Sequence, residues 1–183
     1  MDIFKITNAW RAVGSLLNTR IGSALSQAFG QPVNQMASLV VSADNDVIPW
    51  TEFKTPLAES CLALVSTAGF YLDGDAPFDV DSARGDAGFR TIPSDIAADD
   101  LRIAHTHYSH ARVKKDVNVL FPVDRLRELF QAGVIGRLAP SFYSFGFGGD
   151  LVEAFIGRPD GTAHQLAQAL KAEQVDYVIM IPA

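Results

Sequence analysis

The chain has 183 residues, and its hydrophobic fraction of 48% and charged fraction of 20% exclude disordered and collagen-like proteins. The formal net charge of −6 argues against a nucleic-acid-binding protein, which needs a basic face. The single cysteine, Cys61, excludes a disulfide framework, and no apolar run reaches the length of about 18 residues that a membrane span needs. We therefore expect a cytoplasmic protein that binds neither nucleic acid nor membrane.

The N-terminal 48 residues are predicted to form a helix and a linking arm. Apolar residues recur at spacings of three and four from Trp10 to Phe29, which indicates one face of a helix over residues 7–29. Gly30 and Pro32 then provide a stop signal. We assign residues 1–48 to this arm and residues 49–183 to an α/β domain.

From Cys61 onward, the sequence predicts buried strands that alternate with helices. The unbroken apolar run 61–66 is typical of a strand buried on both faces. The stretch 73–88, rich in aspartate and glycine, is typical of a loop. The remaining predicted elements are strands at 89–93, 101–105, 134–140 and 175–182, helices at 121–133 and 161–173 (with Thr162 as N-cap), and a glycine- and aromatic-rich loop at 141–150. This alternation predicts an open, mainly parallel sheet with crossover helices.

Three of the four histidines lie within six residues, directly after a predicted strand. The spacing of His105, His107 and His110 suits convergence on one divalent metal. It is similar to the HxHxDH zinc motif of metallo-β-lactamase-like hydrolases, except that Ser109 stands where that motif has Asp. The alternative is a polar loop whose imidazoles form hydrogen bonds in a pocket without metal, and we expect no bound metal.

Two other features have both a functional and a structural interpretation. The backbone amides of the glycine-rich loop 143–150 suit an anion, but the loop lacks the third glycine of GxGxxG and the Lys-Ser/Thr of a P-loop. A tight turn is the alternative. Cys61 opens a buried strand, where a lone cysteine is usually a small core residue rather than a nucleophile.

Several short motifs follow one another in order from about residue 49 to the end of the chain. Among them are ALVSTAG (63–69), FRTIP (89–93), HTHYSH (105–110), DVNVLFP (116–122), YSFGFGGD (143–150) and VDYVIMIPA (175–183). In this order and at these spacings they resemble the selenoprotein B subunit family of glycine, sarcosine, betaine and D-proline reductases.

The resemblance implies a reductase subunit with an α/β fold. Such subunits use a selenocysteine or cysteine to cleave a carbon–nitrogen bond of a small amine or amino acid, with a partner subunit that carries a pyruvoyl group. In the family the redox residue follows the strand that matches residues 175–183. We therefore expect it beyond Ala183, and expect no reductase activity from a chain truncated there. The alternative is a non-catalytic ligand- or metal-binding relative that uses His105, His107 and His110.

The candidate site residues lie at or just beyond predicted strand ends or in loops that match the family motifs, because ligands of open α/β sheets bind beyond the carboxyl ends of the strands. We expect His107 to donate or relay a proton, Arg90 to pair with a substrate carboxylate, and Tyr143 to join them as a catalytic residue. The expected substrate-binding residues are Thr67, Gly69, His105, Asn118 and Ser144. We also expect helix 7–29, a partner reductase subunit or a second copy of the chain to pack near the last strand, which would otherwise have a bare face.

Overall fold

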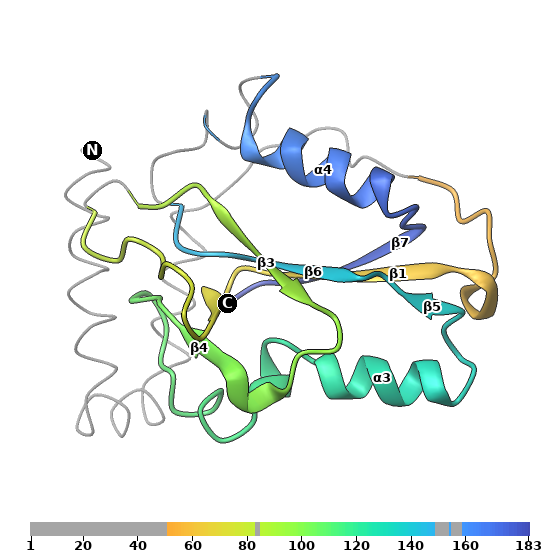
Figure 1. Ribbon diagram of the computed structural model, residues 1–183, viewed down its shortest axis with the longest axis horizontal. Helices are drawn as coiled ribbons and strands as arrows, with labels where there is room; N and C mark the ends of the chain where they lie inside the picture. The colour runs from red at the N-terminus through yellow and green to blue at the C-terminus, as the bar shows by residue number, and fades with distance from the viewer. Residues whose placement is uncertain (1–50, 83–84, 149–153, 155–158) are drawn as a thin grey trace, which may run out of the picture.

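The computed structural model describes residues 51–82, 85–148, 154 and 159–183, so the predicted helix 7–29 and arm 1–48 lie outside the described residues. Figure 1 shows the described elements in space. In chain order they are η1 (Leu57–Glu59), β1 (Cys61–Ser66), β2 (Phe70–Leu72), β3 (Phe89–Pro93), η2 (Ala98–Asp100), β4 (Leu101–Ile103), η3 (Val117–Val119), α3 (Val123–Gln131), β5 (Arg137–Leu138), β6 (Ser141–Phe145), α4 (Thr162–Ala172) and β7 (Tyr177–Ile181).

The main sheet is built around β1. Strand β7 pairs in parallel with Leu62–Ser66 of β1 on one side. On the other side, β5 pairs in parallel with the first half of β1 and β6 with the second half. Strand β3 pairs with β6 and runs antiparallel to it. The sheet is therefore mainly parallel, as predicted, with one antiparallel edge strand.

Strands β5 and β6 act as two parts of one strand with a break between them. The Ala139 amide donates to the Leu62 carbonyl oxygen at 2.8 Å and continues the ladder beyond β5. Pro140 follows and has no amide hydrogen to donate, which interrupts the ladder before β6 begins. The predicted strand 134–140 is only two residues long in the structure, because Pro140 ends it and the amides of Val134 and Ile135 still donate to the Leu129 carbonyl of α3.

The two helices cover opposite faces of the main sheet, with α4 on one side and α3 on the other (Figure 1). Every residue of β1 is buried, which confirms the prediction of a strand covered on both faces. Leu62 and Leu64 belong to the same core cluster as Leu126 of α3. Val65 lies in a different cluster, together with Leu166 of α4. The alternation of side chains along β1 thus supplies both cores.

A second, two-stranded sheet changes the predicted topology. Strand β4 lies within the predicted strand 101–105, but it pairs antiparallel with β2 and not with the parallel sheet. We predicted no strand at the position of β2, which is only three residues long. The prediction of a loop at 141–150 was wrong for its first half, because residues 141–145 form β6 and four of these five are buried.

The structure differs from the prediction at the start of α4 and agrees with it at the end of α3. Thr162 was predicted as an N-cap, but it is the first residue of α4, and Gly161 occupies the cap position without a side-chain hydrogen bond. Gly133 follows α3 with a φ of +72°, as the predicted terminator requires. No helix in the described part of the chain is long and apolar enough to cross a membrane.

Strand β7 exposes one side of its pleat. Tyr177, Ile179 and Ile181 pack against the α3-side core. Val178 and Met180 alternate with them and are 38% and 68% exposed. This agrees with the expectation that one face of the last strand is poorly covered. The expectation that helix 7–29 or a partner covers it stays a prediction.

Candidate functional site

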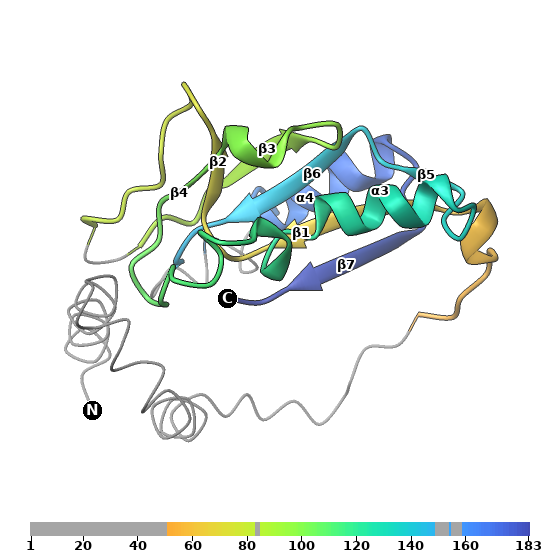
Figure 2. The ribbon, with the colours of Figure 1, turned by 90° about the horizontal axis from the view of Figure 1, so that it is seen from below.

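The carboxyl ends of β1, β6 and β7 lie at one edge of the sheet, where Figure 2 shows their arrows ending on the same side. Hydrogen bonds connect these ends. The Thr67 amide donates to the Ile181 carbonyl at 3.0 Å, and the Ala183 amide donates to the Thr67 hydroxyl at 2.9 Å. The Gly69 amide donates to the Phe145 carbonyl at 2.8 Å. This edge is where an open α/β sheet binds its ligands.

Gly69 attaches the end of β4 to this edge. Its φ is +75°, and a Cβ at this position would lie 2.4 Å from the carbonyl oxygen of Ala104. The Ala104 amide donates to the Gly69 carbonyl at 2.9 Å. Only a residue without a side chain allows this approach. Gly69 therefore holds Ala104, and with it the next residue His105, beside the sheet edge.

His105 is buried at this point, with 7% of its surface exposed. Its Nδ1 accepts the amide hydrogen of His107 at 3.1 Å, which leaves the proton of the neutral ring on Nε2. Burial, followed by the charges of His107 and His110, lowers the pKa of His105 to about 3. A histidine with this pKa stays neutral at pH 7, so His105 orients the loop and does not exchange a proton there.

His107 lies closer to the surface and connects two loops. Its ring stacks on Phe147, in the segment after β6, with 3.5 Å between ring centroids and 14° between planes. The Thr106 hydroxyl lies 3.2 Å from Nδ1 of His107. The ring is therefore held in one place, and its Nε2 atom is buried.

Tyr108 and His110 follow in the same loop as His105 and His107. The Tyr108 hydroxyl donates to the Ala68 carbonyl at 2.9 Å, and burial raises the pKa of Tyr108. The His110 ring lies 4.8 Å from the Tyr108 ring. Burial, and then the charge of Lys114, lowers the pKa of His110. Within the described ranges, no group of three or more His, Cys, Asp or Glu side chains is arranged to hold a metal ion.

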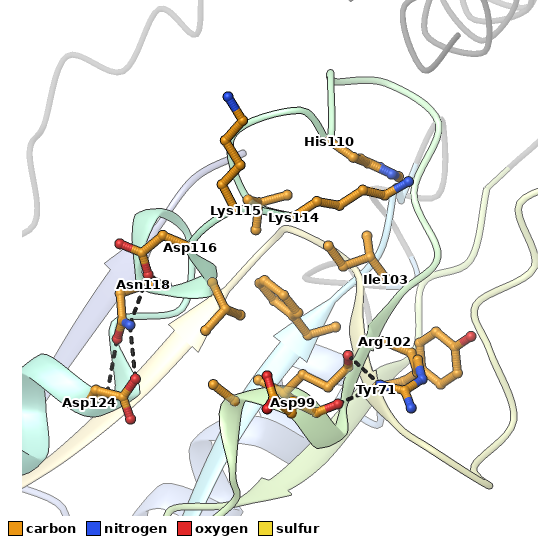
Figure 3. Close-up of a pocket in the computed structure, with 15 residues that line it drawn as sticks. Tyr71, Asp99, Arg102, Ile103, His110, Lys114, Lys115, Asp116, Asn118 and Asp124 are labelled. Atoms are coloured by element: carbon orange, nitrogen blue, oxygen red, sulfur yellow. Dashed lines mark hydrogen bonds between the residues drawn. The ribbon is translucent and has the colours of Figure 1, made fainter. Parts of the chain in front are cut away.

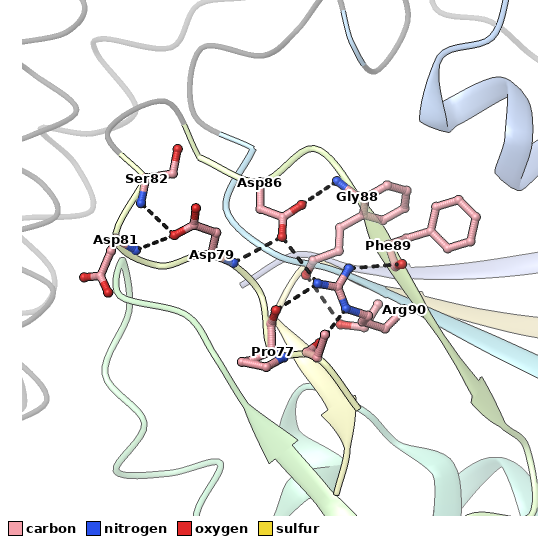
Figure 4. A network of polar contacts seen from close by, with 11 residues as sticks. Pro77, Asp79, Asp81, Ser82, Asp86, Gly88, Phe89 and Arg90 are labelled. Atoms are coloured by element: carbon pink, nitrogen blue, oxygen red, sulfur yellow. Dashed lines mark hydrogen bonds and ion pairs between the residues drawn. The ribbon is translucent and has the colours of Figure 1, made fainter. Parts of the chain in front are cut away.

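Arg90 supports the loop before β3, as Figure 4 shows. Its guanidinium donates to the carbonyl oxygens of Ala76 and Pro77, each at 2.9 Å, and lies 4.2 Å from the centre of the Phe78 ring. It also forms an ion pair of 3.4 Å with Asp86. These contacts occupy the Arg90 guanidinium, which was expected to bind a substrate carboxylate.

Tyr143 and Ser144 point to opposite faces of β6. The Tyr143 ring packs in the α4-side core with Val65, and its hydroxyl donates to a carboxylate oxygen of Glu173 at 3.5 Å. Burial, followed by Glu173, raises the pKa of Tyr143. Ser144 is fully buried, and its hydroxyl accepts the Phe70 amide at 2.9 Å. Both side chains are thus committed to contacts within the fold.

Asn118 belongs to a cavity of about 550 Å³ that His110 also lines (Figure 3). Its side-chain amide donates to Asp116 at 3.0 Å and to Asp124 at 2.9 Å. Its side-chain oxygen accepts the Asp124 amide at 3.0 Å. Asn118 therefore joins η3 to the first turn of α3 and forms part of the cavity wall.

The structure places Thr67 against the end of β7, joins Gly69 to the backbone beside His105, and stacks His107 on Phe147 after β6. Phe147 belongs with them but was missed, because only tertiary structure brings the two loops together; Lys114 and Lys115 in the cavity wall were also missed. Cys61 lies at the other end of β1, is 1% exposed, and burial raises the pKa of its thiol. It is a core residue, as the sequence indicated.

Comparison with known proteins identifies relatives of known type. The family model described as glycine/sarcosine/betaine reductase selenoprotein B matches residues 35–183. The chain is 35% identical to the D-proline reductase subunit gamma of Acetoanaerobium sticklandii over 131 residues, which is 72% of this chain and 52% of that protein. No solved structure matches the chain.

Two further relatives are components of other reductases. The glycine reductase complex component B subunit gamma of Carboxydothermus hydrogenoformans is 30% identical, over 74% of this chain and 31% of that protein. The sarcosine reductase complex component B subunit beta of Peptoclostridium acidaminophilum is 27% identical, over 93% of this chain and 36% of that protein. The chain thus spans about half the length of the D-proline reductase relative and about a third of the other two.

Proposed function

Because the chain belongs to the glycine/sarcosine/betaine reductase selenoprotein B family, we propose that it forms part of a reductase subunit that cleaves a carbon–nitrogen bond of a small amine or amino acid. The proposal includes a selenocysteine or cysteine as the redox group and a partner subunit with a pyruvoyl group, both implied by the resemblance. It also places the reaction at the carboxyl edge of β1, β6 and β7.

The observation that carries this placement is the connection between the end of β7 and the turn after β1. Thr67 donates to Ile181 and accepts from Ala183, so the segment that matches the family motif before the redox residue lies against residues 67–69. His107 is held at the same edge through Phe147. A redox group carried on this strand end would thus lie next to the Thr67 hydroxyl.

Cys61 does not fit the role of redox group. Its thiol is buried and its raised pKa disfavours the thiolate, which is the reactive form. It also lies at the amino end of β1, away from the edge that Thr67 and His107 share. This supports a redox group outside the described residues.

Within the proposed reaction, this chain's own residues position groups and move one proton. His107 is the proton donor or relay, because its ring is fixed by stacking and an imidazole nitrogen can donate or accept a proton. His105 orients the His107 backbone through its Nδ1. The selenol or thiol, when present, supplies the electrons for the bond cleavage.

D-Proline is the first substrate to test, because the D-proline reductase relative shares 35% identity, compared with 30% and 27% for the glycine and sarcosine reductase relatives. Reductive cleavage between Cα and nitrogen opens the proline ring to 5-aminopentanoate. The two electrons and two protons come in the end from a dithiol, which reduces the oxidised redox group again and becomes a disulfide.

The test uses the complete native complex that contains this chain, isolated anaerobically and supplied with dithiothreitol. D-Proline, glycine, sarcosine and betaine are added separately, and product is measured by chromatography. We expect dithiol-dependent cleavage of at least one of them, abolished by prior alkylation with iodoacetate. A complex that turns over none of the four substrates refutes the proposed function.

The role of His107 is tested in the same complex with His107→Phe, which keeps a ring to stack on Phe147 but carries no proton. We expect kcat to fall by roughly 10²–10⁴-fold, the usual contribution of general acid–base catalysis. His164→Ala is the matched control, because His164 is exposed on α4. Equal activity of the His107 variant and the control shows that His107 transfers no proton.

A further inference from the structure

Outside the sheet edge, a cavity of about 550 Å³ lies between the β2–β4 sheet, residues 110–118 and the start of α3. Half-buried Ile103 and Val117 contribute apolar surface to it, and the remaining lining is mostly polar or charged. Its size falls in the range of small-molecule sites, which are concave and combine apolar walls with a few polar groups.

Most of the charged groups in the cavity wall are already engaged. Asp116 and Asp124 accept hydrogen bonds from Asn118, and Asp124 also pairs with Arg127 at 3.4 Å. Arg102 forms an ion pair of 2.9 Å with Asp73. These interactions hold the charged groups in the wall and leave them less able to bind a ligand.

Lys114 and Lys115 differ from them. Among the residues that the structure describes, neither lysine forms an ion pair, and both line the cavity. Figure 3 shows the Lys114 ammonium beside the His110 ring, while Lys115 rises at the rim and Asp99 lies on another wall. The lining as a whole holds three cations and three carboxylates, and Lys114 and Lys115 are the cations in it without an ion pair among the described residues.

We propose that this cavity binds the carboxylate of a small organic acid, with Lys114 as its principal anchor. A charge-assisted hydrogen bond from an ammonium to a carboxylate is about twice as strong as a neutral one, and the apolar surface of Ile103 and Val117 suits a short carbon skeleton. The inference rests on the proposed function for the identity of the acid, because glycine, sarcosine, betaine and proline all carry a carboxylate. Arg90, the cation expected for this task, is engaged by the loop 76–86.

The experiment measures binding without turnover, by titrating the ¹⁵N-labelled full chain with D-proline, glycine or inorganic phosphate. We expect D-proline or glycine to shift the amide signals of residues 110–118 and to saturate. Lys114→Gln should weaken that binding by about tenfold or more, the effect of losing a hydrogen bond to a charged group. Arg112→Gln is the matched control, because it removes the same charge from an exposed residue two positions away that does not line the cavity.

Each outcome decides the inference. No saturable binding of either amino acid, or equal weakening by Lys114→Gln and Arg112→Gln, overturns it. Phosphate that binds as tightly, with the same dependence on Lys114, overturns the assignment to a carboxylate.

Turnover by the native complex, without saturable binding at residues 110–118, overturns the cavity inference and leaves the proposed function standing. Binding that depends on Lys114, in a complex that reduces none of the four substrates, supports the cavity and refutes the proposed function.

Discussion

Replacement of Gly69 by alanine tests how the sheet edge holds the histidine loop. Two costs add at this position. A φ of +75° is unfavourable for any residue with a Cβ, by about 1–2 kcal/mol. The added Cβ would also lie 2.4 Å from the Ala104 carbonyl oxygen and 3.0 Å from Cβ of His105, so the end of β4 must move, which costs about 1–3 kcal/mol as for other overpacked sites. We expect Gly69→Ala to lower the free energy of unfolding by about 2–5 kcal/mol.

Gly133 provides the matched control, because its φ is +72° and a Cβ there meets nothing within 4 Å. Gly133→Ala should therefore show only the backbone cost of about 1–2 kcal/mol. Urea unfolding of both variants, followed by circular dichroism at 25 °C, measures the difference. Amide signals of residues 105–107 should shift in Gly69→Ala and not in Gly133→Ala. Equal losses of stability in the two variants would refute the argument that the contact with Ala104 is rigid.

Three further predictions test the buried polar groups. Ser144→Ala leaves the buried Phe70 amide without its acceptor and should lower the free energy of unfolding by about 1–3 kcal/mol in urea titration, whereas Thr91→Ala, exposed on β3, should change it by less than about 0.5 kcal/mol. Because the pKa of His105 is lowered to about 3 by folding, the unfolded chain binds a proton between about pH 6.5 and pH 3 that the folded chain does not. Stability should be complete above pH 6.5 and fall as the pH decreases, by up to about 1.4 kcal/mol per pH unit, and His105→Gln should remove this component from the pH dependence of urea unfolding. Metal analysis of the chain purified without a histidine tag should give far less than one equivalent, and near-stoichiometric zinc would restore the alternative of a metal site at residues 105–110.

The sequence alone determined those elements whose signal is local. Six consecutive apolar or small residues identified β1, and the helix-terminating Gly133 and the apolar spacing of 121–133 identified α3. Segment 141–150 was misread because its glycines, typical of a loop, follow directly on β6. The family, too, followed from local motifs, since their order and spacing are properties of the chain and not of its packing.

The partners of β4 and of the site residues depended on tertiary structure. Strand β4 pairs with β2 because Gly69 allows Ala104 to approach within hydrogen-bonding distance, a contact across 35 residues that no pattern in the sequence encodes. The sequence identified His107 as a candidate, but only the fold places its ring on Phe147. Arg90 shows the same limit, because its charge is visible in the sequence, whereas its engagement by Ala76 and Pro77 depends on where the loop before β3 lies. Residue type determines what chemistry a side chain offers, and long-range packing decides whether that chemistry remains available to a ligand.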